Sequence, residues 1–327
     1  MGLQQTFFAA AENLSGKRDR SCPAFNPTFY TTFAMAFASI YPAGMAADGG
    51  KNVVVRDKKL VVGAHAWYSG QRDKKQTAGE REMFTAEHLI WMVLCAAFIA
   101  GMTVLSTKKR WSLRQAGYVM TAICAFSEVS KVMSEMRASP AGGMALDPGA
   151  LPFHLCSLML FGVLYITFGR EGRARQAVIS FLAVMGTLGS FCAIMIPTNG
   201  TDFTQIYAYQ CFVYHAGLLW FCLHLLLSGR AELGAKALVR NLGLLLALTF
   251  AMLYVNGALS AYGTNFMYVV RPPMEGLPFL NLDRGWYVYL LRLMLLGAGL
   301  VTLFHLPFIL RERKKKREAA GAGRSGK

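Results

Sequence analysis

The chain has 327 residues, of which 54% are hydrophobic and only 16% are charged, and its mean hydropathy is +0.35. This composition is too apolar for a single soluble domain, so it predicts an integral membrane protein. On a soluble surface, the formal net charge of +16 would suggest a nucleic-acid partner. Here the basic residues are concentrated in short connections and in the C-terminal tail. We therefore expect no nucleic acid and interpret the charge as a topology signal.

The seven cysteines occur singly, and most lie inside apolar runs. They form no CxxC pair and no metal-ligand spacing, so the sequence supports neither a disulfide framework nor a zinc site. We interpret most of them as small core residues and keep only Cys156 as a candidate. The chain also lacks a GxSxG motif, a Walker loop and a GxGxxG at a helix start. No metal and no cofactor is predicted.

The first 83 residues differ in character from the rest of the chain. A modest apolar run at 28–47 lies between a basic segment and a series of small residues, an order that resembles a secretory signal. The pattern at 53–62 is compatible with a short hairpin, and 71–82 is a polar linker. Translation that begins near Met83 is an equally weighted alternative. We therefore treat residues 1–83 as a poorly defined N-terminal extension.

Seven apolar segments occupy most of the remaining chain, at 86–106, 116–136, 151–169, 177–196, 207–227, 241–260 and 286–309. Each has about 20 residues, which is enough for a helix to cross a hydrocarbon core of about 30 Å. They predict an all-α fold, a polytopic membrane helix bundle of about seven transmembrane helices over residues 84–310. A basic tail at 311–327 comes after the bundle.

Basic charge alternates between the connections of this bundle. The connections after the first, third and fifth segments are basic, as is the tail, whereas the others hold only Arg137, Arg271 and Arg284. The positive-inside rule places the basic connections and the C-terminus in the cytoplasm. We therefore expect a multi-pass protein of the cell membrane, in contact with membrane lipids, with its N-terminal region outside.

With this topology, polar side chains gather in the outer half of the bundle. They are Glu128 and Lys131 in the second segment, His154 and Cys156 at the start of the third, Gln210, Tyr214 and His215 in the fifth, Asn256 near the end of the sixth, and Asn265 and Tyr268 after it. Polar groups inside membranes normally face the bundle interior or a wet cavity. The pattern therefore predicts a polar pocket that opens outward.

Plainer explanations compete for several of these residues. Glu128 and Lys131 are three positions apart and could simply neutralise each other, and Gln210 could be an interhelical hydrogen bond. His154 and His215 are harder to explain in this way, because two histidines at similar depth on separate segments need a shared explanation. On one helix, residues two apart point about 200° apart, so His154 and Cys156 are not expected to face one centre squarely.

Short motifs at 84–89, 151–158, 210–217, 263–268 with 272–273, and 305–308 together resemble the bacterial YwaF-type integral membrane proteins. These proteins are similar to the vertebrate transmembrane protein 164 family, and the resemblance spans residues 84–310. The vertebrate relative is described as a membrane acyltransferase that builds polyunsaturated ether phospholipids through a catalytic cysteine and histidine. The resemblance implies that His154 lies in the cysteine-bearing motif and that His215 matches the second histidine. Phe153 stands where the family cysteine would be, and Cys156 comes two residues after His154 instead.

The leading hypothesis is acyl transfer on a lipid, with Cys156 as nucleophile, His215 as base and His154 as an orienting group or oxyanion donor. The predicted substrate contacts are Glu128, Gln210, Asn256, Asn265 and Tyr268. The residues leave open a transporter, flippase or receptor that binds a ligand in the same pocket without chemistry. They also leave open a haem or metal protein that uses His154 and His215. A microbial rhodopsin is excluded, because the seventh segment has no lysine for retinal.

Overall fold

The computed structural model describes residues 84–138, 144–197, 199–273, 277 and 279–325, with side chains described as far as Glu318. All of these residues belong to one compact unit, Lys59–Lys327. The predictions for residues 1–83, namely the signal-like order, the hairpin, the linker and the later start, lie outside the described residues.

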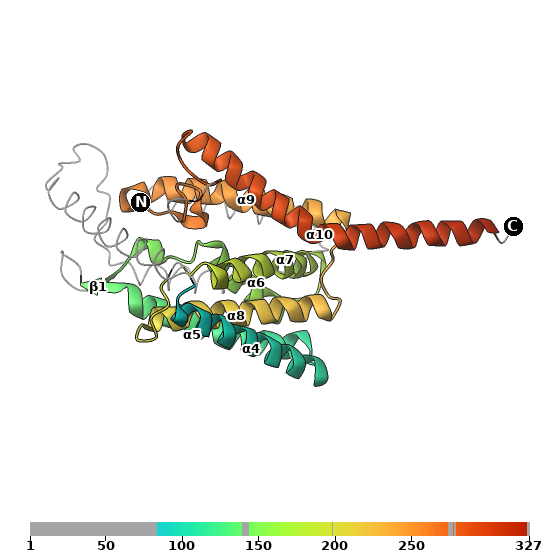
Figure 1. The fold of residues 1–327 in the computed structure, drawn as a ribbon, viewed down its shortest axis with the longest axis horizontal. Coiled ribbons are helices and arrows are strands. Elements are labelled where there is room, and N and C mark those ends of the chain that lie inside the picture. Colours follow the sequence, from blue (N-terminus) through green and yellow to red (C-terminus); the bar gives the residue numbers. More distant parts are fainter. Residues whose placement is uncertain (1–83, 139–143, 198, 274–276, 278, 326–327) are drawn as a thin grey trace, which may run out of the picture. The chain divides into compact units, whose positions relative to one another are not determined.

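Each of the seven predicted segments corresponds to a helix, which confirms the all-α membrane bundle (Figure 1). The helices are α4 (Ala86–Lys108), α5 (Leu113–Glu135), α6 (Leu155–Phe168), α7 (Arg173–Met195), α8 (Ile206–Leu227), α9 (Ala235–Ala258) and α10 (Trp286–Ser325). Five of them, α4, α7, α8, α9 and α10, are long and apolar enough to cross a membrane. α5 and the 14-residue α6 do not meet that criterion by themselves.

Local sequence signals set where the first helices begin. Thr85 caps α4 by accepting a hydrogen bond from the backbone N–H of His88. Ser112 caps α5 in a reciprocal capping box with Gln115, in which each side chain bonds the other residue's backbone N–H. Such caps satisfy N–H groups that the first helical turn leaves unpaired.

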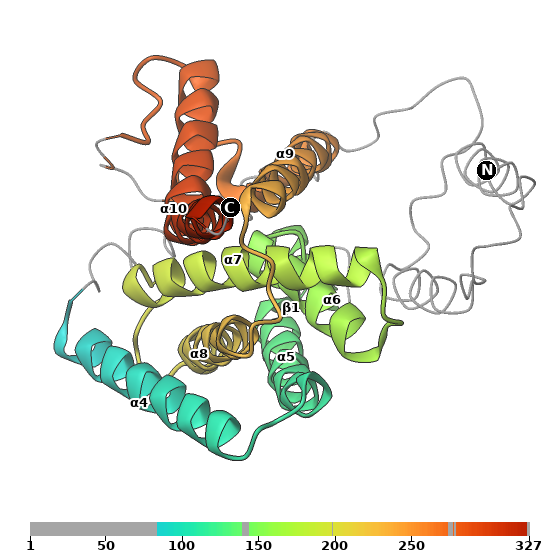
Figure 2. The same cartoon turned by 90° about the vertical axis from the view of Figure 1, so that its right-hand side faces the viewer.

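α8 is the central helix of the bundle. It packs against α7, α5 and α4, as Figure 2 shows, while α9 and α10 lie against the other side of α7. In the most apolar stretch of α8, 72% of the residues are buried, against 17% in α4, α9 and α10. Most of the apolar surface of α4, α9 and α10 is therefore left for lipid, which agrees with membrane embedding.

Several helix boundaries differ from the predictions, and those of α6, α9 and α10 have clear causes. α6 begins at Leu155, because residues 148–154 form a 3₁₀ turn (η1, Pro148–Ala150) and a bend, so Pro152 precedes the helix. α9 begins at Ala235, since residues 235–240 are helix-forming but too polar to extend an apolar run. α10 continues through the basic tail, where Lys316 pairs with Glu312 at 2.6 Å in i,i+4 spacing.

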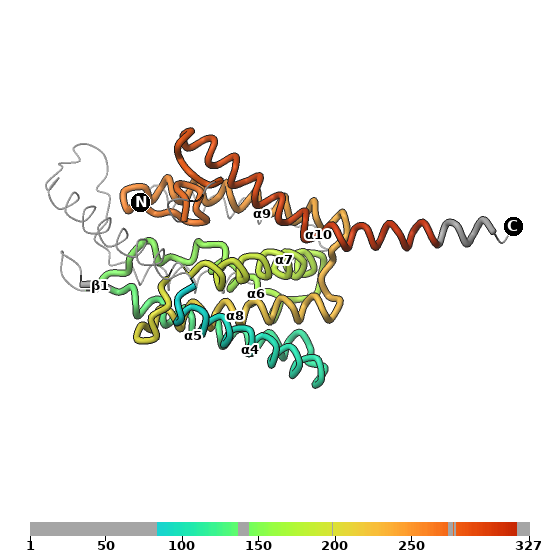
Figure 3. The backbone as a smooth tube through the Cα atoms, viewed as in Figure 1, coloured from blue at the N-terminus to red at the C-terminus, as the bar shows by residue number. Residues whose placement is uncertain are grey.

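Figure 3 shows that α10 bends along its length, and Pro307 lies inside this helix. A proline inside a helix removes a backbone hydrogen bond and favours a kink.

A short antiparallel hairpin, which the sequence did not predict, joins α5 to η1. Its strands are β1 (Met136–Ala138) and β2 (Met144–Leu146), with Arg137 opposite Ala145. Strands of three residues carry too little alternation to be predicted. The hairpin marks one end of the bundle, where α5 ends and α6 begins; we call it the hairpin end. The opposite end, with the α8–α9 connection and the tail, is the tail end.

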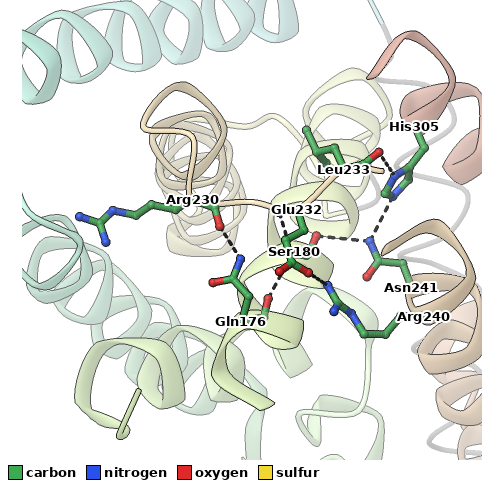
Figure 4. A network of polar contacts seen from close by, with 8 residues as sticks. All are labelled: Gln176, Ser180, Arg230, Glu232, Leu233, Arg240, Asn241 and His305. Atoms are coloured by element: carbon green, nitrogen blue, oxygen red, sulfur yellow. Dashed lines mark hydrogen bonds and ion pairs between the residues drawn. The ribbon is translucent and has the colours of Figure 1, made fainter. Parts of the chain in front are cut away.

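A polar network at the tail end ties four segments together (Figure 4). His305 of α10 contacts the carbonyl oxygen of Leu233 through Nδ1 at 3.0 Å and the amide nitrogen of Asn241 through Nε2 at 3.2 Å. Asn241 also donates to the carbonyl of Ser180 on α7. Because a carbonyl can only accept and an amide nitrogen can only donate, Nδ1 of His305 donates to Leu233 and Nε2 accepts from Asn241.

Candidate functional site

A cavity of about 400 Å³ lies between α5, α6, α7 and α8 near the hairpin end. Its volume falls within the roughly 300–1,000 Å³ that is typical of small-molecule sites. Several of the predicted site residues line it: Glu128, Lys131, His154, Cys156, Gln210, Tyr214, His215 and Tyr268. Apolar side chains, among them Met159, Met185 and Leu218, line it as well. The cavity therefore suits a ligand with a polar part and an apolar part.

His154 and Cys156 both line this cavity, contrary to the helical geometry expected from their spacing. The reason is that His154 is the N-cap of α6 and has an extended backbone, with φ −68° and ψ 150°. The 200° separation applies only inside a helix. Tyr214 on α8 donates a hydrogen bond of 2.5 Å to the carbonyl oxygen of Cys156, so the first turn of α6 is held against α8.

His215 is buried on α8, and a hydrogen bond fixes its tautomer. Its Nδ1 lies 2.7 Å from the carbonyl oxygen of Cys211, one turn earlier on the same helix. A carbonyl oxygen only accepts, so Nδ1 carries the proton. In the neutral ring, Nε2 then holds the lone pair and is available to accept a proton. This is the arrangement of a general base whose ring is oriented through its other nitrogen.

The histidines of the described bundle separate into structural and cavity-lining groups. His88 and His305 have both ring nitrogens hydrogen-bonded; His88 joins the α4 start to the carbonyl of Ile194. His154 instead makes ring contacts, with Phe266 and Tyr268, each at 5.4 Å between centroids. His224 has an unpartnered Nε2 but does not line the cavity. Within the described bundle, only His154 and His215 therefore present imidazole groups to the cavity.

The α5 wall of the cavity carries the predicted polar residues. Lys131 Nζ lies 2.7 Å from a carboxylate oxygen of Glu128, so the two charges do neutralise each other, yet both line the cavity. Gln210 on α8 donates to Ser127 Oγ at 2.7 Å, which is the interhelical bond considered from the sequence. Each of these residues combines a structural contact with a place on the cavity wall.

The structure does not bring Asn256 and Asn265 to the cavity. Asn256 donates to the carbonyls of Met252 and Phe266 and accepts from the N–H of Phe266. Asn265 accepts from the N–H groups of Val270 and Arg271. Their amides are occupied by backbone groups, so they order the connection after α9 and do not line the cavity.

That connection, residues 263–273, closes one side of the cavity, and we call it the capping loop. Its 3₁₀ turn η3 (Phe266–Tyr268) carries Met267 and Tyr268, which line the cavity and have positive φ angles of 54° and 56°. Non-glycine residues in this region are strained and persist only where surrounding contacts hold them. Here Tyr289 donates to the carbonyl of Tyr268, and Trp286 donates to that of Val269.

Cys211 and Ser190 are among the cavity residues that were not predicted from the sequence. Cys211, interpreted as a core residue, has its Sγ 3.6 Å from His215 Nδ1 and lines the cavity. The i,i+4 spacing of Cys211 and His215 on one helix is a signal that was present in the sequence. Ser190 of α7 lines the cavity too, and nothing in its apolar surroundings marked it out.

The donor set also bears on the haem or metal hypothesis. Within the described residues, no group of three or more His, Cys, Asp or Glu side chains is placed to hold a metal ion. The thiol of Cys156 and the imidazoles of His154 and His215 line one cavity, and a thiol near a neutral imidazole is a pair of groups that can carry out covalent acyl transfer.

These features define a multi-pass membrane helix bundle with a partly polar cavity near one end. The model of the TMEM164 family matches residues 83–305, and the chain belongs to this family. No curated protein and no solved structure matches the chain.

Proposed function

We propose that this protein is a membrane lipid acyltransferase whose site is the cavity at the hairpin end. The observation that carries the proposal is that one cavity brings together the thiol of Cys156 and the unprotonated Nε2 tautomer of His215. The membership of the TMEM164 family agrees with it through the resemblance described above.

The transfer would run in two balanced steps. In the first, His215 takes the thiol proton, the Cys156 sulfur forms a bond to the ester carbonyl carbon, and the carbon–oxygen bond breaks. The leaving lysolipid oxygen takes the proton back from His215, so a thioester and a lysolipid result. In the second, the hydroxyl of an acceptor lysolipid loses its proton to His215 and attacks the thioester, which returns the thiol. His154 would donate to the developing oxyanion or orient the ester.

The charge alternation described above supports an orientation for this site. With the C-terminus in the cytoplasm, the cavity lies in the outer half of the membrane, and lipids of the outer leaflet would enter it sideways. A C-terminal fusion to green fluorescent protein should then fluoresce, whereas a fusion to alkaline phosphatase at the same place should be inactive. The reverse pattern would place the cavity in the inner leaflet.

Untargeted lipidomics on the native host tests the function. A deletion strain is complemented with the wild type, Cys156→Ala, His154→Ala or His215→Ala, and with Cys95→Ala as a buried cysteine outside the cavity. A lipid class that shifts on deletion should be restored by the wild type and Cys95→Ala only. Restoration by Cys156→Ala would remove the nucleophile from the scheme.

A transporter, flippase or receptor is the second candidate, because the Glu128–Lys131 pair on the cavity wall could hold a charged ligand without chemistry. This second candidate becomes the better one if no lipid class changes on deletion. It predicts transport or a conformational response that survives Cys156→Ala and is lost when the Glu128–Lys131 pair is removed.

A further inference from the structure

Ser190 is a buried hydroxyl whose hydrogen bond is missing. Its side chain is 1% exposed, its Oγ has no partner within the described residues, and it lines the cavity. Buried polar groups are nearly always hydrogen-bonded, so each exception requires an explanation. We propose that Ser190 donates a hydrogen bond to the ester carbonyl oxygen of a lipid bound in the cavity. This inference deepens the proposed function and rests on its premise that a lipid ester occupies the cavity.

The other hydroxyls of α7 show what Ser190 does not do. Ser180 donates to the carbonyl of Gln176 at 3.1 Å, and Thr187 donates to that of Ala183 at 2.6 Å. Both use the carbonyl four residues earlier, which is the usual partner of a hydroxyl inside a helix. Ser190 makes no such bond. Thr103 and Thr121 are also unpartnered within the described chain, but they do not line the cavity.

The register of α7 against α8 places Ser190 at the depth of His215. Cys222 Sγ bonds the carbonyl of Leu182 at 3.2 Å, and a Cβ at Gly186 would meet Cys222 and Leu218. The two helices are antiparallel, so a step of four residues toward the C-terminus of α7 corresponds to a step of about four residues toward the N-terminus of α8. Ser190 is therefore level with the turn that carries Tyr214 and His215. A carbonyl between the two helices would be within reach of both Ser190 and the base.

The wall beside Ser190 is open enough to admit a ligand. A Cβ at Gly189 would meet no atom within 4 Å, and Gly189 lines the cavity. By contrast, the space at Gly186, one turn deeper, is filled by Cys222. Unfilled space therefore adjoins the residue next to Ser190, at the level of the base, and we place the ester carbonyl there.

The test compares two lipids that differ only in the carbonyl. Dissociation constants are measured on the purified full-length chain in detergent, for dioctanoyl phosphatidylcholine and for the dioctyl ether lipid with the same headgroup. The wild type should bind the ester lipid several-fold to tenfold more tightly than the ether lipid, because only the ester offers the acceptor. Ser190→Ala should bring that ratio close to one. Thr187→Val, which removes a hydroxyl already bonded within α7, should keep the wild-type ratio.

A stability measurement guards against a folding artefact. Ser190→Ala removes a hydroxyl without a partner, so its thermal midpoint in the absence of lipid should equal or exceed that of the wild type.

The ratio of the dissociation constants for the ether and ester lipids decides the inference. A ratio of one in the wild type, or an unchanged ratio in Ser190→Ala, would overturn it. If the ratio depends on Ser190 but no acyl group is transferred, the contact stands and the enzyme proposal fails. If acyl transfer occurs but the ratio of the two dissociation constants is the same in Ser190→Ala as in the wild type, only the proposed hydrogen bond from Ser190 is refuted.

Discussion

Glu128 and Lys131 show how one pair of residues can serve both the fold and a ligand. Their ion pair is 2.7 Å long, and the exposed fraction of the side chain is 28% for Glu128 and 10% for Lys131. A lysine so poorly solvated needs its partner, since an unpaired charge in a membrane bundle is costly. Any single substitution therefore disturbs the structural role, and a single mutant does not separate that role from ligand binding.

Exchanging the two charges separates these roles. Glu128→Lys combined with Lys131→Glu keeps an i,i+3 pair, so we expect stability to change by about 0.5 kcal/mol or less. Because the charges on the cavity wall trade places, lipid turnover should fall about tenfold or more if the pair contacts the polar part of the ligand. Initial rates and thermal midpoints are measured together.

The matched control is the exchange of Lys314 and Glu318, an exposed i,i+4 pair in the tail. It should leave turnover unchanged. If the Glu128–Lys131 exchange variant turns over lipid at the wild-type rate, the two residues only neutralise each other and do not contact the ligand.

We expect opposite effects on stability from replacing His305 and from replacing His224, although both residues lie toward the tail end. Replacing His305 by Leu removes the ring that contacts the Leu233 carbonyl and leaves the Asn241 amide nitrogen with its bond to the Ser180 carbonyl, so we expect a loss of about 1–3 kcal/mol in unfolding free energy. His224→Leu removes a ring whose buried Nε2 has no partner within the described residues, so it should be neutral or stabilising. Thermal unfolding in detergent compares the two, and equal midpoints would contradict the assigned roles.

At the scale of elements, the cavity depends on α7 and on the capping loop as much as on α6 and α8. α7 supplies Met185, Gly186, Gly189 and Ser190 to the wall, and the capping loop supplies Met267 and Tyr268. Asn256 and Asn265 do not line the cavity; their side chains accept hydrogen bonds from backbone N–H groups of the capping loop and so hold that loop in place. The polar residues of the sequence thus divide into those on the cavity and those that order an element beside it.

Filling the cavity from α7 should limit the size of its ligand. Gly189→Leu places a side chain in the open space beside Ser190, so turnover of long-chain lipids should fall more than that of short-chain lipids. Gly243→Leu is the control, because Gly243 on α9 is exposed and also has open space at its Cβ. Rates are measured over a series of acyl lengths, and an unchanged chain-length profile in Gly189→Leu would contradict this view of the wall.

For the whole molecule, hydropathy was enough to predict the seven helices, because apolar runs of about 20 residues have few alternative structures. The ends were less predictable where polar but helix-forming residues extend a span, as in α9 and the tail of α10. The division of the polar residues was not predictable, because it depends on contacts between helices. Ser190 and Asn256 illustrate this: both are polar residues near the hairpin end, yet within the described chain Ser190 lacks a partner and Asn256 makes three hydrogen bonds.

The most direct test of the central claim is a search for the acyl-enzyme on Cys156. Purified protein in lipid vesicles, supplied with an ester donor but no lysolipid acceptor, is analysed by intact-protein and peptide mass spectrometry. We predict a mass gain of one acyl group less one hydrogen on the peptide that carries Cys156. The adduct should be released by hydroxylamine, disappear when a lysolipid is added, and be absent from Cys156→Ala and His215→Ala. Lipid turnover without any adduct, or an adduct that persists in Cys156→Ala, would contradict the account.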